Sequence, residues 1–162
     1  MTPTSQLTAS SNLSPIPAIL SVMKKDEHNC YRQEEGLFRL ANLAVNEENM
    51  KKITEEGGII TILSAMTKFS DNEKVQEYGC EALCNLAVDD INRKKIADDK
   101  GIPKILQAMD KHCYSAKVQH YGCEALCNLA VDKNNKEKIA KEEGIAIILS
   151  AMTNHSYDAT VQ

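Results

Sequence analysis

The sequence predicts an all-α protein, a solenoid built from stacked three-helix repeats. Its main signature is an internal period of 43 residues: VQEYGCEALCNLAVDD, which begins at Val75, returns at Val118 as VQHYGCEALCNLAVDK. Residues 78–89 and 121–132 are identical, and 27 of the 43 positions match over the whole unit, far more than chance would give. Apolar residues within a unit recur at intervals of three and four, as in amphipathic helices. Such a unit cannot bury its own apolar face, so we expect the copies to stack.

Four copies of the unit run through the chain, and the outer two are incomplete. We expect a flexible segment at residues 1–13, a partial repeat at 14–46, full repeats at 47–89 and 90–132, and a truncated repeat at 133–162. Four residue types recur at the same 43-residue period: Gln33, Gln76, Gln119 and Gln162; Met23, Met66, Met109 and Met152; Gly58, Gly101 and Gly144; Asn42, Asn85 and Asn128.

Each full repeat is predicted to contain three helices. In the repeat at 90–132, the first helix is expected over residues 92–100. Gly101 is expected to end it, because glycine commonly follows the last residue of a helix. The second helix is expected over residues 102–112, and the third, which is the longest, over residues 116–131.

Composition limits the classes of function. Apolar residues make up 43% of the chain, which argues against disorder, and the net charge of −4 argues against nucleic acid or an anionic membrane as the partner. No apolar run reaches the ~20 residues of a membrane span, and the N terminus lacks the pattern of a signal peptide. The six cysteines are therefore expected in a reducing compartment, which favours a cytoplasmic location, with the nucleus as the alternative.

Two segments of the repeat resemble the armadillo family. GCEALCNLA, in the third helix, is similar to the family pattern Ala-Leu-x-x-Leu-x-Asn-Ile/Leu-Ala, and KGIPKIL, GGIITIL and EGIAIIL are similar to its entry into the second helix. A helical period of 43 residues also lies in the armadillo and HEAT range, and three helices per unit favour armadillo. The resemblance covers residues 14–162. It implies a right-handed superhelix whose third helices line a concave groove that binds other proteins.

Asparagine recurs at the centre of the expected exposed face of the third helices. The resemblance implies that Asn42, Asn85 and Asn128 grip the backbone of an extended peptide. A side-chain amide both donates and accepts hydrogen bonds, so it can pair with peptide N–H and C=O groups whatever the peptide's side chains. The alternative is that each Asn bonds within its own repeat and shapes the turn.

Further rows of exposed residues are expected beside the asparagines when the repeats stack. Nuclear-import receptors of this fold carry Trp one turn before the Asn, where this chain has Phe38, Glu81 and Glu124, so no aromatic cage for lysine is expected. Together with Asp89 and Asp132, the glutamates predict an acidic groove that favours an extended, neutral-to-basic peptide, unless they form only a solvated face. The predicted binding residues besides the asparagines are Phe38, Lys74, Tyr78, Glu81, Asp89, Lys117, Tyr121, Glu124 and Asp132.

The cysteines do not form a recognisable metal site. Cys80 and Cys84 repeat as Cys123 and Cys127, and this C-x3-C spacing fits no standard zinc motif. Cysteine is a common small core residue, so we expect four free, mostly buried thiols, with no metal and no cofactor.

An interaction scaffold is the favoured function, and two alternatives remain. One is a passive structural spacer within a larger multidomain protein, and the other is a Cys/His enzyme or thiol redox protein. The second alternative is disfavoured because the sequence contains no phosphate-binding loop, nucleophile elbow or other catalytic motif. Self-association through the apolar C-terminal second helix, around Ile145, Ile148 and Leu149, is a further expectation.

Overall fold

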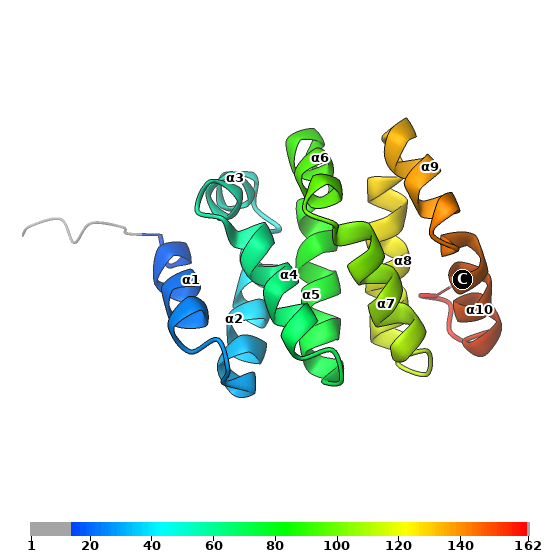
Figure 1. The fold of residues 1–162 in the computed structure, drawn as a ribbon, viewed down its shortest axis with the longest axis horizontal. Coiled ribbons are helices and arrows are strands. Elements are labelled where there is room, and N and C mark those ends of the chain that lie inside the picture. Colours follow the sequence, from blue (N-terminus) through cyan, green and yellow to red (C-terminus); the bar gives the residue numbers. More distant parts are fainter. Residues whose placement is uncertain (1–13, 162) are drawn as a thin grey trace, which may run out of the picture.

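The computed structural model describes residues 14–161, which form a single row of α-helices without any strand (Figure 1). The segment 1–13, expected to be flexible, lies outside the described residues. None of the helices described is long and apolar enough to cross a membrane. Their bounds are α1 (Ile16–Lys25), α2 (Cys30–Leu43), α3 (Glu47–Glu55), α4 (Gly58–Lys68), α5 (Glu73–Leu86), α6 (Asp90–Asp98), α7 (Gly101–Lys111), α8 (Ala116–Leu129), α9 (Lys133–Lys141) and α10 (Gly144–Asn154).

The helices occupy three repeating positions in the row. Complete units are formed by α3, α4 and α5 and by α6, α7 and α8, while α1 and α2 take the second and third positions of the preceding unit. The third helices α2, α5 and α8 pack side by side in one layer (Figure 1). The second helices α1, α4, α7 and α10 form a second layer, in which α1 packs on α2, α4 on α5 and α7 on α8. The predicted all-α solenoid of three-helix repeats is therefore confirmed.

Side-chain caps determine where the first helices begin. The Asp89 carboxylate accepts a 2.9 Å hydrogen bond from the backbone N–H of Asn92, and α6 accordingly starts at Asp90. Asn46 caps α3 and Asp132 caps α9 in the same way. The predicted start at Asn92 is two residues too late, because it followed the apolar pattern and ignored the capping side chain.

Gly101 has a different role from the one predicted. It is the first residue of α7, and the residue with left-handed torsions is Lys100, whose φ is 64°. A Cβ at Gly101 would lie 2.4 Å from Ile96 Cγ2 and 2.8 Å from the Ile96 carbonyl oxygen. Glycine is therefore needed here for the close approach of the first and second helices, and the prediction that Gly101 ends the first helix is wrong. The second and third helices also end slightly earlier than predicted, at Lys111 and Leu129.

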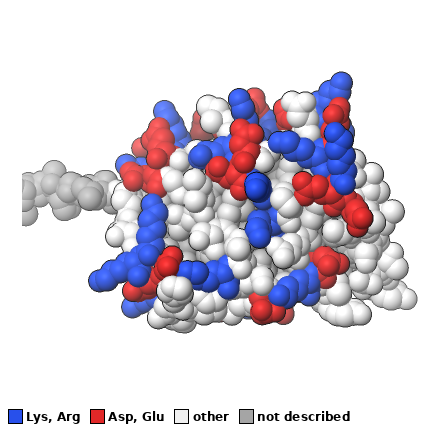
Figure 2. Space-filling model, viewed as in Figure 1, with Lys and Arg blue, Asp and Glu red and all other residues white. Residues whose placement is uncertain are grey.

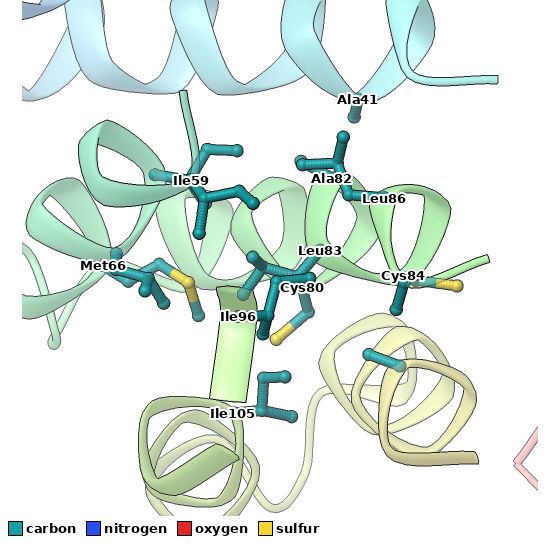
Figure 3. Close-up of a cluster of buried hydrophobic side chains, with 14 of the residues drawn as sticks. Ala41, Ile59, Met66, Cys80, Ala82, Leu83, Cys84, Leu86, Ile96 and Ile105 are labelled. Carbon is teal, nitrogen blue, oxygen red and sulfur yellow. The ribbon is translucent and has the colours of Figure 1, made fainter. Parts of the chain in front are cut away.

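The apolar core extends along the whole row. Figure 3 shows its centre, where Cys80 and Leu83 of α5 lie near Met66, Ile96 and Ile105 from the second and first helices. Each of these five side chains is 2% exposed or less. Full burial of side chains of this kind stabilises a fold by about 1.5–3 kcal/mol each, so stacking contributes far more than any single surface contact.

A buried glutamine joins the second and third helices of each unit. Gln76 Nε2 donates hydrogen bonds to the carbonyl oxygens of Met66 at 3.0 Å and Phe69 at 2.9 Å. Gln33 and Gln119 make the same pair of bonds in their own units. These carbonyls lie at the C-terminal end of the second helix, where intrahelical donors run out. The 43-residue spacing of glutamine thus has a structural cause.

The cysteines of the third helices differ in burial. Cys80 and Cys84 are buried in α5, whereas Cys123 of α8 is half-buried and Cys127 is exposed, and all four are free thiols. Desolvation raises the pKa of both Cys80 and Cys84 to about 12. The expectation of mostly buried thiols fails for α8, because among the described residues no further third helix covers its outer side.

Candidate partner-binding face

We use the term third-helix face for the exposed surface of α2, α5 and α8. Because these helices pack side by side, residues of neighbouring rows meet across them. The rings of Phe38 in α2 and Tyr78 in α5 lie 5.3 Å apart between centroids. Lys74 Nζ lies 5.7 Å from the centroid of the Tyr78 ring, within the range of a cation–π contact. Three of the predicted binding residues are thus brought together.

The central asparagines join one unit to the next. Asn85 Nδ2 donates a 3.1 Å hydrogen bond to the carbonyl oxygen of Ala41 in α2, and Asn128 Nδ2 donates a 3.2 Å bond to that of Cys84 in α5. Both carbonyls lie in the last turn of a third helix, where intrahelical donors are lacking. The bonds therefore run to the preceding repeat, rather than staying within the same repeat as the alternative interpretation supposed.

Asn42 has no preceding third helix among the described residues. Its Nδ2 donates instead to the carbonyl oxygen of Phe38, one turn earlier in α2, at 2.8 Å. In Asn42, Asn85 and Asn128 alike, Oδ1 accepts no hydrogen bond from the described residues. Each amide therefore keeps an acceptor available, while its donor is already used.

The two predicted lysines bind a carboxylate that the sequence did not single out. Glu77 is 2% exposed and accepts hydrogen bonds from Lys74 Nζ at 2.7 Å and from Lys117 Nζ, in the next unit, at 3.0 Å. The hydrogen bond to Glu77 is the main cause that raises the pKa of Lys74. Glu34 and His120 occupy the equivalent positions, so the repeat pattern carried no signal for a buried carboxylate at this point.

The two predicted glutamates occupy different environments. Glu81 is half-buried on α5 beside Tyr121 of α8, and desolvation raises its pKa, partly opposed by the hydrogen bond from the Tyr121 hydroxyl. Desolvation and the nearby Glu81 carboxylate raise the pKa of Tyr121 in turn. Glu124 is exposed, with one oxygen 3.7 Å from His120 Nε2.

The two predicted aspartates serve as helix caps. Asp89 and Asp132 each accept a hydrogen bond from the backbone of the first helix that follows, as described above. Their carboxylates are exposed, and one oxygen of each is used as a cap. Asp89 and Asp132 follow the ends of α5 and α8, so Glu81 and Glu124 are the two predicted carboxylates that lie on the third helices themselves.

Comparison with known families agrees with this geometry. The sequence matches the family described as the GAC ARM domain over residues 16–162, almost the whole of the chain. The chain belongs to this armadillo-repeat family.

Comparison of this ARM domain with curated proteins found no match. Among solved structures, it is similar to an engineered protein, Northeast Structural Genomics Consortium target OR329, with a TM-score of 0.79 and 22% sequence identity. The match covers 93% of this chain and 59% of that chain, so the ARM domain spans less than two thirds of the engineered protein. At this level of identity the likeness concerns the fold alone.

Histidines form a second set of links between units of the ARM domain. His112, which follows α7, donates from Nε2 to the carbonyl oxygen of Ser70 in the preceding unit at 2.8 Å. His155, which follows α10, makes the equivalent 2.9 Å bond to the carbonyl oxygen of Cys113. A His at this place favours the negative end of a helix, but the sequence alone could not reveal these bonds, because each acceptor lies 42 residues away along the chain.

The side chains on the third-helix face offer polar recognition. They comprise amide acceptors, two carboxylates and aromatic rings, which can hydrogen-bond to a backbone, pair with a cation or pack against an apolar group. Within residues 14–161, no cluster of three or more His, Cys, Asp or Glu side chains is arranged to hold a metal ion.

Proposed function

We propose that this ARM domain is a protein-interaction scaffold whose third-helix face binds an extended segment of a partner protein. The observation that carries the proposal is the row of Asn42, Asn85 and Asn128, each with an open Oδ1 acceptor. Packed helices lie about 8–10 Å apart, which is close to the span of three extended residues. A peptide that crosses α2, α5 and α8 could therefore present a backbone N–H to each amide.

The charge preference of the proposed site would come from Glu81 and Glu124. Desolvation disfavours the ionised form of Glu81, and a Lys or Arg side chain of the peptide would offset that cost. We therefore expect a neutral-to-basic segment, rather than nucleic acid or membrane, as the partner. No catalytic activity or cofactor is part of the proposal, and the cytoplasm or nucleus stays the predicted location.

The test uses peptides selected from a displayed library against the whole chain. The double variant Asn85→Ala with Asn128→Ala should weaken every selected peptide, by ~1 kcal/mol for each lost hydrogen bond, because the backbone contact does not depend on peptide sequence. Glu81→Lys with Glu124→Lys should weaken only the basic peptides and reduce the salt dependence of their binding. Affinity is measured by calorimetric titration.

A matched control removes two exposed amides elsewhere. Asn134→Ala with Asn154→Ala leaves the third-helix face intact and should leave affinity unchanged. Thermal melts must accompany the titrations, because Asn85 and Asn128 also bond to the neighbouring unit. If the asparagine and the glutamate double variants both keep the fold and bind peptides with unchanged affinity, the third-helix face is excluded as the binding surface.

A passive spacer is the second candidate, and one observation favours it. The Nδ2 atoms of Asn85 and Asn128 already tie adjacent units together, so the asparagine row has a structural use without any partner. Under this alternative the asparagine variants lose stability, and library selection returns no peptide that binds the third-helix face.

A further inference from the structure

The first helices α3 and α6 border an open cleft that is separate from the third-helix face. Its volume is about 670 Å³, within the range of pockets that hold ligands or partner side chains. Figure 2 shows charged side chains gathered along this upper edge of the molecule, over α3, α6 and α9. The cleft, which we call the α3–α6 cleft, is lined by residues of both helices, among them Glu47, Glu48, Met50, Thr54, Glu55 and Ile91.

The walls of the α3–α6 cleft carry apolar side chains. Met50 of α3 is half-buried, while Ile91 of α6 is 74% exposed. Thr54 Oγ1 donates a 2.6 Å hydrogen bond to Asn92 Oδ1 across the two helices. Asn92 is only 2% exposed, yet its Nδ2 donates to none of the described residues. This Nδ2 atom is not wholly buried, so the cleft has both apolar walls and an unused polar donor that a ligand can reach.

The rim of the α3–α6 cleft is mainly acidic, and its carboxylates make no ion pair with the described residues. Glu47, Glu48 and Glu55 make no ion pair with the described residues, and the Asp89 carboxylate is capped only by a backbone N–H. Lys51 is the single base among the residues that line the cleft. Some acidic residues elsewhere on the surface pair with bases, as in the Lys111–Asp71 pair at 2.6 Å, so what distinguishes the rim is that its acids lie beside apolar walls. The rim therefore suits a partner that brings Lys or Arg.

The corresponding seam between α6 and α9 has different chemistry. Arg93 stands in the place of Met50 and donates from Nη1 to the carbonyl oxygens of Ala87 and Val88, while it also pairs with Asp90. Ala97 and Asn134 replace Thr54 and Ile91, while Asp98 takes the place of Glu55. The solenoid fold accepts either set of residues, so the apolar lining of the α3–α6 cleft by Met50 and Ile91 is not required for stacking.

From this lining we infer that the α3–α6 cleft docks a segment of a partner protein that inserts an apolar side chain between Met50 and Ile91. Lys or Arg residues flanking that side chain would face Glu47, Glu48 and Glu55. The inference concerns a second surface and does not depend on peptide binding at the third-helix face.

The test uses three synthetic peptides of equal length with the whole 15N-labelled chain. The first carries a central Leu flanked by Lys and Arg, the second replaces the bases with Glu, and the third replaces the Leu with Ser. The first peptide should bind most tightly, with NMR shift changes concentrated in α3 and α6. The second and third should bind at least about tenfold more weakly, because each lacks one half of the recognition.

Two variants take their residues from other repeats, so the fold tolerates the changes. Glu47→Lys with Glu55→Lys introduces the residues that α9 carries at these positions, and Met50→Arg introduces that of α6. Each should weaken the first peptide at least about tenfold. The control Glu137→Lys with Glu142→Lys makes the same charge change at exposed positions of α9 and its end, and should leave binding unchanged.

Several outcomes would overturn the inference. These are the absence of binding, shift changes confined to α2, α5 and α8, and an equal loss in the α9 control. Shift changes in α3 and α6 that follow protein concentration without peptide would indicate a second copy instead. An equal response to N-acetyl-leucinamide alone would indicate a small-molecule site. The Asn85→Ala, Asn128→Ala variant should bind the first peptide normally, which separates this test from that of the proposed function.

Discussion

The helices α5 and α8 share an identical stretch of sequence but not the same environment. Residues 78–89 and 121–132 are the same twelve letters, and both fold into third helices. In α5, which lies between two other third helices, Cys84 is 4% exposed. In α8, whose outer side meets no further third helix in the described chain, the equivalent Cys127 is exposed. The burial of one face is thus a property of position in the stack and not of local sequence.

The inner face of the two helices is the same in both places. Leu86 of α5 and Leu129 of α8 are both 0% exposed. Figure 3 shows Leu86 on the side of α5 that faces Ala41 of the preceding unit, so its burial does not depend on how many units follow. A comparison of equivalent substitutions in α5 and α8 therefore separates packing against the preceding unit from packing against the following unit.

The largest effect is expected where the two helices agree. Leu86→Ala and Leu129→Ala should each lower the free energy of unfolding by ~2–5 kcal/mol, the usual cost of truncating a buried Leu. Chemical denaturation of the two variants measures this. A cost near zero for Leu129→Ala alone would show that the last unit is already loose, and the comparison would fail.

The next effect concerns thiol reactivity, where the helices should differ. Alkylation proceeds through the thiolate, and burial raises the pKa of Cys80 and Cys84 to about 12. At pH 8, Cys127 should react with iodoacetamide at least ~100-fold faster than either, as measured by mass spectrometry over time. Similar rates for all four cysteines would contradict the difference in burial between α5 and α8.

A smaller difference is expected for stability at the same cysteines. Cys80→Ser places a hydroxyl in a fully buried apolar site and should cost ~1–3 kcal/mol. Cys123→Ser should cost less, because its half-buried site leaves the hydroxyl access to water. Thermal melts of the pair test this, and Cys127→Ser, at an exposed position, provides a control within ~0.5 kcal/mol of the parent.

The sequence predicted the fold well because the repeat period and the apolar spacing both report on stacking. It also placed Asn85 on a third helix, but it did not predict the direction of the amide bond. That direction depends on the Ala41 carbonyl, which lacks a donor only because α2 ends nearby. Gly101 was misinterpreted for a similar reason, since its contact with Ile96 is invisible in a helix-ending pattern.

Features that depart from the period could not be predicted from it. Glu77 binds two lysines from adjacent units, yet its equivalents in the other third helices are Glu34 and His120. The α3–α6 cleft likewise depends on residues that the next seam replaces. Repeats make the common framework easy to predict, while the side chains that distinguish one unit from another require the three-dimensional arrangement.

The smallest predicted effect is a pH dependence at Glu81. Because its folded-state pKa is raised, the folded chain binds this proton more tightly than the unfolded chain does. The resulting stabilisation is complete below the unfolded pKa and is lost as pH rises through the folded pKa. Glu81→Gln should therefore gain stability relative to the parent between about pH 4 and pH 7, by less than ~1 kcal/mol after solvent screening.

Denaturation curves at several pH values measure the Glu81 effect. Gln keeps an acceptor for the Tyr121 hydroxyl, so the comparison isolates the charge. If Glu81→Gln instead loses stability relative to the parent as pH rises, the Glu81 carboxylate is better stabilised in the folded chain than its desolvation implies.

The hydrogen bonds of Gln33, Gln76 and Gln119 lie inside units, whereas those of Asn85, Asn128 and His112 cross from one unit to the next. The molecule is therefore a series of like elements in which element strength and coupling strength reside in different side chains. Such a series behaves as a one-dimensional cooperative lattice. Pulled from its two ends, it would lengthen in discrete steps. Changes at the glutamines would alter the force of each step, and changes at the asparagines would alter how many elements yield together.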